Sequence, residues 1–128
     1  MPVLLDTHTL LWWATGESRL SRTAHALISS LAEEVFVSAA SAWEVTTKVR
    51  LGKLPGAERF AEDFSVNVER LGFRPLAITV DHGQRAGLLP GPHKDPFDRL
   101  LTAQSLAENM PLVSNETIFD EYKIRRIW

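Results

Sequence analysis

The stretch VFVSAASAWEVTTKVRLG (Val35–Gly52) decides the fold, because it joins a β-strand directly to a helix. The three residues before Ser38 are β-branched or aromatic, which is typical of a strand. Ser38 can cap the helix that follows, and Gly52 can end it. The stretch therefore predicts a strand over Val35–Ser38 and then a helix, which together form the repeating unit of an α/β fold.

Similar short apolar runs lie on either side of this unit. They are PVLLD (Pro2–Asp6), PLAITV (Pro75–Val80), PLVS (Pro111–Ser114) and IRRIW (Ile124–Trp128). We expect a strand at each, the last at a sheet edge because its two arginines need water. Helical patterns separate the strands and are expected at residues 7–16, 22–34, 57–72 and 81–91, and from residue 96 to about 110.

Strands that alternate with helices predict an α/β protein. We expect a three-layer α/β/α sandwich with a central, mostly parallel sheet of about five strands. The length of 128 residues suits a single domain, residues 1–128, with one hydrophobic core.

The composition excludes several classes of protein. The net charge of −2 gives no broad basic surface for nucleic acid, and the absence of cysteine excludes disulfides and thiolate metal sites. The longest apolar runs, such as LLWWA (Leu10–Ala14), fall far short of the roughly 20 residues that a membrane span needs. The first residues carry no positive charges typical of a signal peptide, so we expect a cytoplasmic protein without a membrane segment.

Four acidic residues occur where such a fold places functional groups. Asp6 ends the first strand, Glu44 lies in the helix after the second, Asp98 begins the helix before PLVS, and Glu116 follows PLVS. In a parallel sheet the strand ends and the starts of the following helices share one edge. We therefore expect these four carboxylates to converge.

Converging carboxylates repel one another unless a cation lies between them. A set of oxygen ligands suits Mg²⁺, with Mn²⁺ as an alternative, and the corresponding chemistry is hydrolysis of phosphodiesters. Asp98 has another interpretation, because Pro96 fits the first position of a helix and makes Asp95 its N-cap. Asp98 could then bend back to Asp95 as a capping box, and the local pattern leaves both interpretations open.

Four motifs together resemble the PIN domains, and within them the VapC-type toxins of bacterial toxin–antitoxin pairs. They are LLDTHTLLWW (Leu4–Trp13), VSAASAWEVTTKVRLGKL (Val37–Leu54), HKDPFDRLLTAQS (His93–Ser105) and LVSNETIF (Leu112–Phe119). The resemblance covers nearly the whole chain. It implies a Mg²⁺-dependent endoribonuclease that cuts RNA, a cognate antitoxin protein as partner, and a homodimer.

The resemblance also implies a catalytic and metal-binding quartet. Its first three members match Asp6, Glu44 and Asp98. The fourth position, usually aspartate, falls on Glu116, whose longer side chain could ligate a metal directly, through water, or not at all; Asp120 is the less favoured substitute. Glu44 has the alternative of a surface ion pair with Lys48, four residues further along its helix.

Other polar and aromatic residues are secondary candidates. We do not expect His8 or His93 to bind metal, since no zinc spacing exists. Thr7 and Ser41 could hydrogen-bond the carboxylates. Candidates for stacking on bases are Trp12, Trp13, Trp43 and Trp128, and candidates for contacting phosphates are Lys48, Arg50, Lys53, Lys94 and Arg99.

Two other functions compete with the nuclease. A PIN-like scaffold that only binds RNA or protein would gain support if Glu116 weakens metal binding. A receiver-like Mg²⁺-binding domain is disfavoured, because Thr7 and His8, not a second acid, follow Asp6, and no lysine follows LVS before Lys123.

Overall fold

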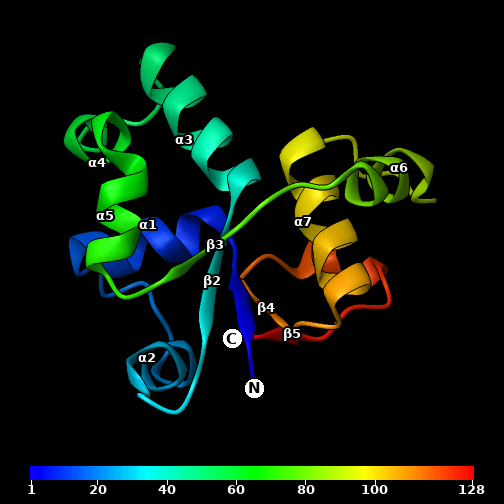
Figure 1. The fold of residues 1–128 in the computed structure, drawn as a ribbon, viewed down its shortest axis with the longest axis horizontal. Coiled ribbons are helices and arrows are strands. Elements are labelled where there is room, and N and C mark those ends of the chain that lie inside the picture. Colours follow the sequence, from blue (N-terminus) through cyan, green and yellow to red (C-terminus); the bar gives the residue numbers. More distant parts are fainter.

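The computed structural model describes residues 1–128 as one parallel sheet covered by helices on both faces (Figure 1). The strands are β1 (Val3–Leu5), β2 (Val35–Ser38), β3 (Arg74–Leu76), β4 (Leu112–Val113) and β5 (Arg126–Ile127). Their order is β3-β2-β1-β4-β5, and every neighbouring pair is parallel. The predicted three-layer sandwich is confirmed, with all rather than most strands parallel and β5 at an edge.

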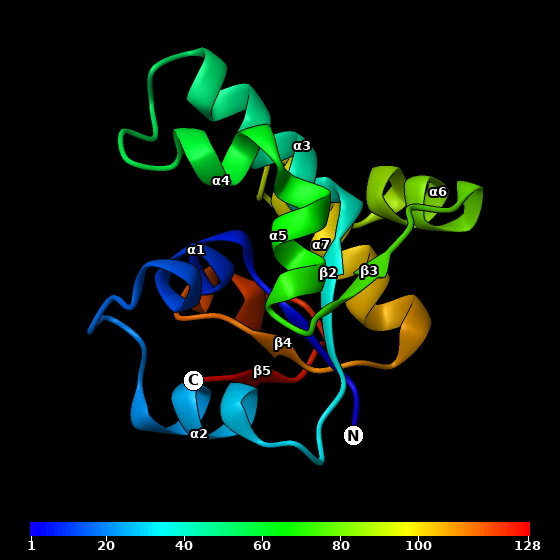
Figure 2. The same cartoon turned by 60° about the vertical axis from the view of Figure 1, so that its left-hand side comes forward.

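The helices divide between the two faces of the sheet. They are α1 (Thr7–Thr15), α2 (Arg22–Ser29), α3 (Ala39–Arg50), α4 (Glu58–Glu62), α5 (Phe64–Arg70), α6 (Val80–Leu88) and α7 (Pro96–Glu108), with a short 3-10 helix η1 (Thr117–Glu121). Helices α1, α2, α4 and α5 lie on one side of the sheet, whereas α6 and α7 lie on the other (Figures 1 and 2). None of these helices combines the length and the apolar composition that a membrane span requires.

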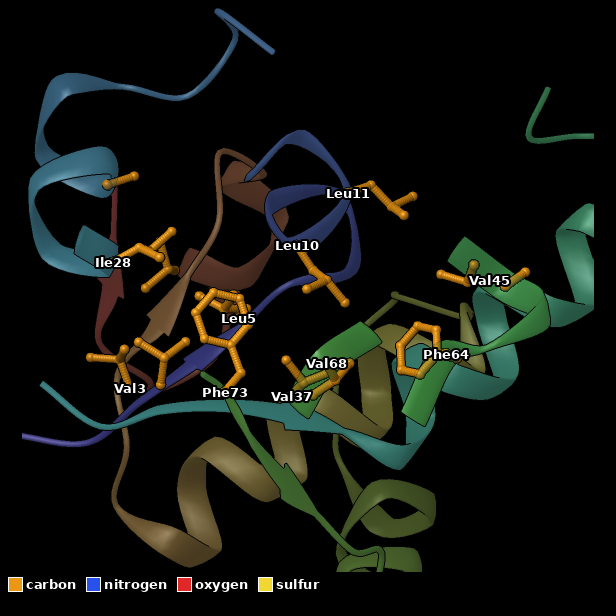
Figure 3. Close-up of a cluster of buried hydrophobic side chains, with 14 residues drawn as sticks. Val3, Leu5, Leu10, Leu11, Ile28, Val37, Val45, Phe64, Val68 and Phe73 are labelled. Carbon is orange, nitrogen blue, oxygen red and sulfur yellow. The ribbon is translucent and has the colours of Figure 1, made fainter. Parts of the chain in front are cut away.

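Two hydrophobic clusters follow from the alternation of side chains along the strands. Val3 and Leu5 of β1 point to the face covered by α1, α2 and α5, where Phe64 and Val68 meet them in the larger cluster (Figure 3). Leu4 points the other way and packs with Leu101 of α7 in the smaller cluster. The central strand β1 is therefore buried on both faces.

Polar residues at the strand ends start the helices. Asp6 caps α1 by accepting from the backbone N–H of Thr7, and Ser38 caps α3 by accepting from Ala40. Asp95 caps α7 and accepts from the N–H groups of Phe97 and Asp98, as predicted. These short strand-to-helix junctions put the helix starts at the carboxyl edge of the sheet.

Three predicted elements differ most from the structure. The helix expected over 22–34 ends at Ser29, because the backbone of Ser30 is extended (φ −71°, ψ 127°). The helix expected over 57–72 is interrupted at Asp63, whose backbone is not helical (φ −118°, ψ 43°), and the amide of Asn67 donates across the break to the carbonyl of Phe60 (3.2 Å). The strand expected over 75–80 ends at Leu76, because Thr79 forms a capping box with His82 and starts α6 there.

Candidate active site

The four acids predicted from the sequence lie at the carboxyl edge of the sheet or on the helices that start there. Asp6 directly follows β1, Glu44 lies in α3, Asp98 in the first turn of α7, and Glu116 at the start of η1. The first three are buried, with 2%, 4% and 8% of their surface exposed, whereas 36% of the Glu116 side chain is exposed. The charge of Glu116 helps to raise the pKa values of both Asp6 and Asp98, after the larger effect of their burial.

Asp6 is held at both carboxylate oxygens. Its Oδ1 accepts from the backbone N–H of Thr7 and its Oδ2 from the hydroxyl of Ser114, each at 2.7 Å. Burial raises the pKa of Asp6 to about 7; the Ser114 hydrogen bond opposes that rise, and the charges of Glu116 and Asp98 add to it. The Asp6 carboxyl is therefore partly protonated near neutral pH when no cation is bound.

Asp98 has a partner that the sequence did not indicate. Its Oδ2 lies 2.7 Å from Nε2 of His93, in the loop before α7, so the capping-box interpretation of Asp98 is wrong. Burial raises the pKa of Asp98 to about 6; the His93 hydrogen bond counters this, and the charges of Asp95 and Glu116 reinforce it. Asp98 is thus a second acid that ionises with difficulty in this fold.

Glu44 pairs with Lys48 along α3, as the alternative interpretation expected, yet it is buried rather than on a solvated face. Burial by itself lowers the pKa of Lys48. The hydrogen bond to Glu44 and the charges of Glu44 and Asp95 together have a larger effect, so the pKa of Lys48 is raised. The second oxygen, Oε1, is buried and has no hydrogen-bond partner. Glu44 therefore has one acceptor atom free for a ligand.

Glu116 lies beside the imidazole of His8, whose Nδ1 is 3.6 Å from its carboxylate. This interaction lowers the pKa of Glu116, because the carboxylate is favoured in its charged form, and it raises the pKa of His8. Glu116 thus ionises readily, in contrast to Asp6 and Asp98. Asp120, the alternative fourth acid, pairs instead with Arg126, and this pairing lowers its pKa.

The orientation of these side chains does not form a ready metal cage. No three or more of the histidine, aspartate and glutamate residues lie close enough together to hold a metal ion. Each acid is turned toward a partner of its own: Ser114 for Asp6, Lys48 for Glu44, His93 for Asp98 and His8 for Glu116. The metal site expected from the sequence therefore stays a prediction.

Ser114, at the end of β4, is the polar residue that sequence reasoning missed. Its hydroxyl donates to Asp6 and also accepts from the backbone N–H of Glu116 (3.0 Å). It is fully buried, so it links two of the acids from within the protein. The sequence feature that could have identified Ser114 is its position at the carboxyl end of a predicted strand, because Asp6 occupies the same position on the first strand.

Two expectations for secondary residues are wrong. Ser41 hydrogen-bonds the hydroxyl of Thr7 (2.9 Å) rather than a carboxylate, whereas Thr7 does bond a carboxylate, through its backbone N–H to Asp6. The guanidinium of Arg99 does not face a phosphate site, because it donates to backbone carbonyls at the end of α6 and at His93. That His8 and His93 do not bind metal stays a prediction, and their contacts with Glu116 and Asp98 were not predicted.

A comparison with curated proteins finds one relative that is similar over about half of this chain. One curated relative, Ribonuclease VapC16 from Mycobacterium tuberculosis, is 39% identical over 61 residues, which are 48% of this chain and 42% of that protein. The match thus spans less than half the length of that relative.

Solved structures show the same fold at low sequence identity. VapBC2 from Rickettsia felis, bound to a DNA fragment from its promoter, is 16% identical, with 99% of this chain and 98% of that chain covered and a TM-score of 0.69. VapC20 from Mycobacterium tuberculosis, a toxin that cleaves the sarcin–ricin loop, is 18% identical, with 95% of each chain covered and a TM-score of 0.66. The PIN domain family matches residues 3–124, nearly the whole chain. With this match and the fold, the chain belongs to the PIN domain family.

Proposed function

We propose that this chain is a Mg²⁺-dependent endoribonuclease and acts as the toxin of a toxin–antitoxin pair. One observation carries the proposal: Asp6 and Asp98 lie far apart in the sequence, are both buried, and have pKa values raised to about 7 and about 6. Burial of acids that repel one another is unfavourable for folding, so a compensating function is expected. A bound dication provides it.

The donor set fits such an ion in chemical type. Asp6, Glu44, Asp98 and Glu116 would hold Mg²⁺, or Mn²⁺, through oxygen atoms, which are the ligands these ions prefer. The buried and unpartnered Oε1 of Glu44 supports this assignment. When bound, the ion neutralises charge on a phosphodiester and makes water a better nucleophile.

The protein's own groups orient the acids and the substrate. Thr7 and Ser114 fix the plane of the Asp6 carboxylate, and His93 fixes that of Asp98. Lys48, next to Glu44, keeps a positive charge at the site where an RNA phosphate would approach. With a net charge of only −2, phosphate attraction has to come from such local cations.

The relatives support the proposed substrate and antitoxin. VapC16 is named a ribonuclease, VapC20 is described as a toxin that cleaves the sarcin–ricin loop, and VapBC-5 belongs to the VapBC family of toxin–antitoxin systems. By analogy, this chain cuts RNA and is held inactive by a cognate antitoxin. The homodimer and the cytoplasmic location rest on the sequence resemblance alone. An antitoxin with a basic side chain would suit the acidic site.

A second function, a PIN-like scaffold that binds without cutting, is favoured by one observation. No group of acids forms a metal cage as the side chains are oriented, and Glu116, with 36% of its side chain exposed, lies beside His8 instead. Under this alternative the acids would bind a basic partner rather than a metal. Cleavage assays separate the two functions.

Purified protein incubated with end-labelled RNA tests the proposal. We expect cleavage in Mg²⁺ and none in EDTA, with Asp6→Asn and Asp98→Asn reducing the rate at least about 100-fold, more than the loss of an outer hydrogen bond usually costs. Asp63→Asn, an exposed acid between α4 and α5, serves as the matched control and should cut normally. Cleavage that survives EDTA or Asp6→Asn would refute the metal mechanism, and complete inactivity of the wild type would favour the scaffold.

A further inference from the structure

A pair of aromatic rings, one of them exposed, bridges the two helices that carry Glu44 and Asp98. The rings of Trp43 in α3 and Phe97 in α7 have centroids 4.8 Å apart and meet at 70°, an edge-to-face arrangement. Trp43 keeps 55% of its surface exposed. Because Phe97 meets it nearly at right angles, at least one face of the indole is left uncovered by that ring.

Each ring belongs to the residue directly before one of the acids: Trp43 precedes Glu44, and Phe97 precedes Asp98. The ammonium group of Lys48, further along α3, is bonded to Glu44. The charges of Asp95 and Asp98, at the start of α7, also act on Lys48. The aromatic pair, a cation and two buried acids are therefore carried by the same two helices.

The other three tryptophans do not offer a comparable free face. Trp12 lies between His8 and Trp128, with the guanidinium of Arg19 over its ring, and Trp13 packs against the larger hydrophobic cluster. All three are at least partly buried. Of the four tryptophans, only Trp43 leaves more than half of its surface in solvent, which makes its ring available to a ligand.

We propose that Trp43 is a binding residue that stacks on an unpaired base of the RNA substrate, with Phe97 holding the indole in place. This assignment rests on the proposed function. Lys48 would then contact the backbone phosphate beside that base. The acids would lie at the phosphodiester that is cut. Stacking on a side chain needs a base that is out of a duplex, so the substrate class is single-stranded or loop RNA.

Binding measured without cleavage tests this assignment. A fluorescent single-stranded RNA oligonucleotide of mixed sequence and its fully paired duplex are titrated with protein in EDTA, and again in Ca²⁺. We expect Trp43→Ala to weaken single-strand binding roughly 5- to 150-fold, the range for loss of one base stack. Trp43→Phe should bind within about threefold of the wild type, and duplex binding should be weak and unaffected by either change.

Leu51→Ala is the matched control, because Leu51 lies at the end of the same helix with 52% of its surface exposed. It should leave RNA binding unchanged. Equal binding by Trp43→Ala and the wild type overturns the stacking assignment even if cleavage still needs Mg²⁺, whereas a wild type that binds no RNA overturns the proposed function as well. A change of oligomeric state in Trp43→Ala, measured by light scattering, without a change in RNA binding would assign Trp43 to a protein interface instead.

Discussion

The hydroxyl of Ser114 donates a 2.7 Å hydrogen bond to Oδ2 of Asp6, joining residues 108 positions apart in the sequence. The backbone of Ser114 is itself fixed, because its N–H donates to Ile127 and its carbonyl accepts from Arg126. The hydrogen bond lowers the pKa of Asp6 against the effect of burial. Ser114 thus controls how easily the most buried acid of the site ionises.

Ser114→Ala should therefore move the pH dependence of RNA cleavage. Without the hydroxyl the pKa of Asp6 rises further, so the acidic limb of the rate profile shifts to higher pH. Stability should also fall by about 1–3 kcal/mol, because the backbone N–H of Glu116 loses its acceptor. Both effects are measured on one variant, by cleavage between pH 5 and 9 and by urea unfolding.

A matched control for this change is Ser105→Ala. Ser105 is also buried, but its hydroxyl donates to the backbone carbonyl of Met110 at the far end of α7. This variant should lose similar stability and keep the wild-type pH profile. If both variants show the same profile, Ser114 is only a packing residue.

Protein free of metal should become less stable as the pH rises from about 4 to about 7. The folded-state pKa of Asp6 is raised from 3.8 to about 7, so over this window the folded state binds more protons than the unfolded state. Each unit of pKa shift corresponds to about 1.4 kcal/mol. The shift of Asp6 from 3.8 to about 7 therefore lowers the free energy of unfolding above pH 7 by on the order of 4 kcal/mol, compared with its value at about pH 4. Urea unfolding in EDTA at pH 5 and pH 8 measures the difference.

Asp6→Asn should flatten this dependence, since the amide does not ionise and can still accept from Thr7. Asp63→Asn, at an exposed acid, should leave it intact. An Asp6→Asn protein whose stability falls with pH as steeply as the wild type would contradict the assignment of the effect to this carboxyl.

Binding of Mg²⁺ should release protons at mildly acidic pH. With pKa values of about 7 for Asp6 and about 6 for Asp98, both carboxyls are wholly or partly protonated at pH 6, and a metal binds their ionised forms. We expect release of on the order of one proton per ion at pH 6 and close to none at pH 9. Calorimetry in two buffers of different ionisation enthalpy counts these protons; binding without release at pH 6 would show that other groups hold the metal.

Local patterns predicted much of this structure, because they reflect hydrogen bonds between neighbouring residues. Ser38 and Asp95 were recognised as helix caps from the polar side chain just before each helix, and the structure has both. The four acids could be placed at one edge because parallel strands all end there. How their side chains orient could not be predicted from that rule.

The remaining features depend on contacts between distant segments or on loop conformation. The hydrogen bond between Ser114 and Asp6 exists only because β4 pairs with β1. No spacing of residues in the sequence predicts it. His93 reaches Asp98 because the loop before α7 folds back on the helix. The helix break at Asp63 likewise had no glycine or proline to mark it.

Arg99 contacts both ends of the loop before α7 (residues 89–95), so we expect its side chain to hold this loop in place. The guanidinium donates to the carbonyls of Ala86 (3.0 Å) and Leu89 (2.6 Å) at the end of α6 and to that of His93 (2.9 Å). Arg99→Ala should cost about 1.5–3 kcal/mol, the range for hydrogen bonds to a charged group, and should slow RNA cleavage because His93 is no longer held beside Asp98.

Arg50→Ala removes an exposed arginine from the last turn of α3 and is the control, with an expected loss under about 1 kcal/mol. Urea unfolding gives the two stabilities, and limited proteolysis reports on residues 89–95, which should be cut faster in Arg99→Ala alone. Arg99→Lys should recover only part of the loss, since an ammonium group cannot reach three separated carbonyls with the fixed fork of a guanidinium. Equal stability and equal proteolysis of the Arg99→Ala and Arg50→Ala proteins would show that the loop is held by its own backbone and not by Arg99.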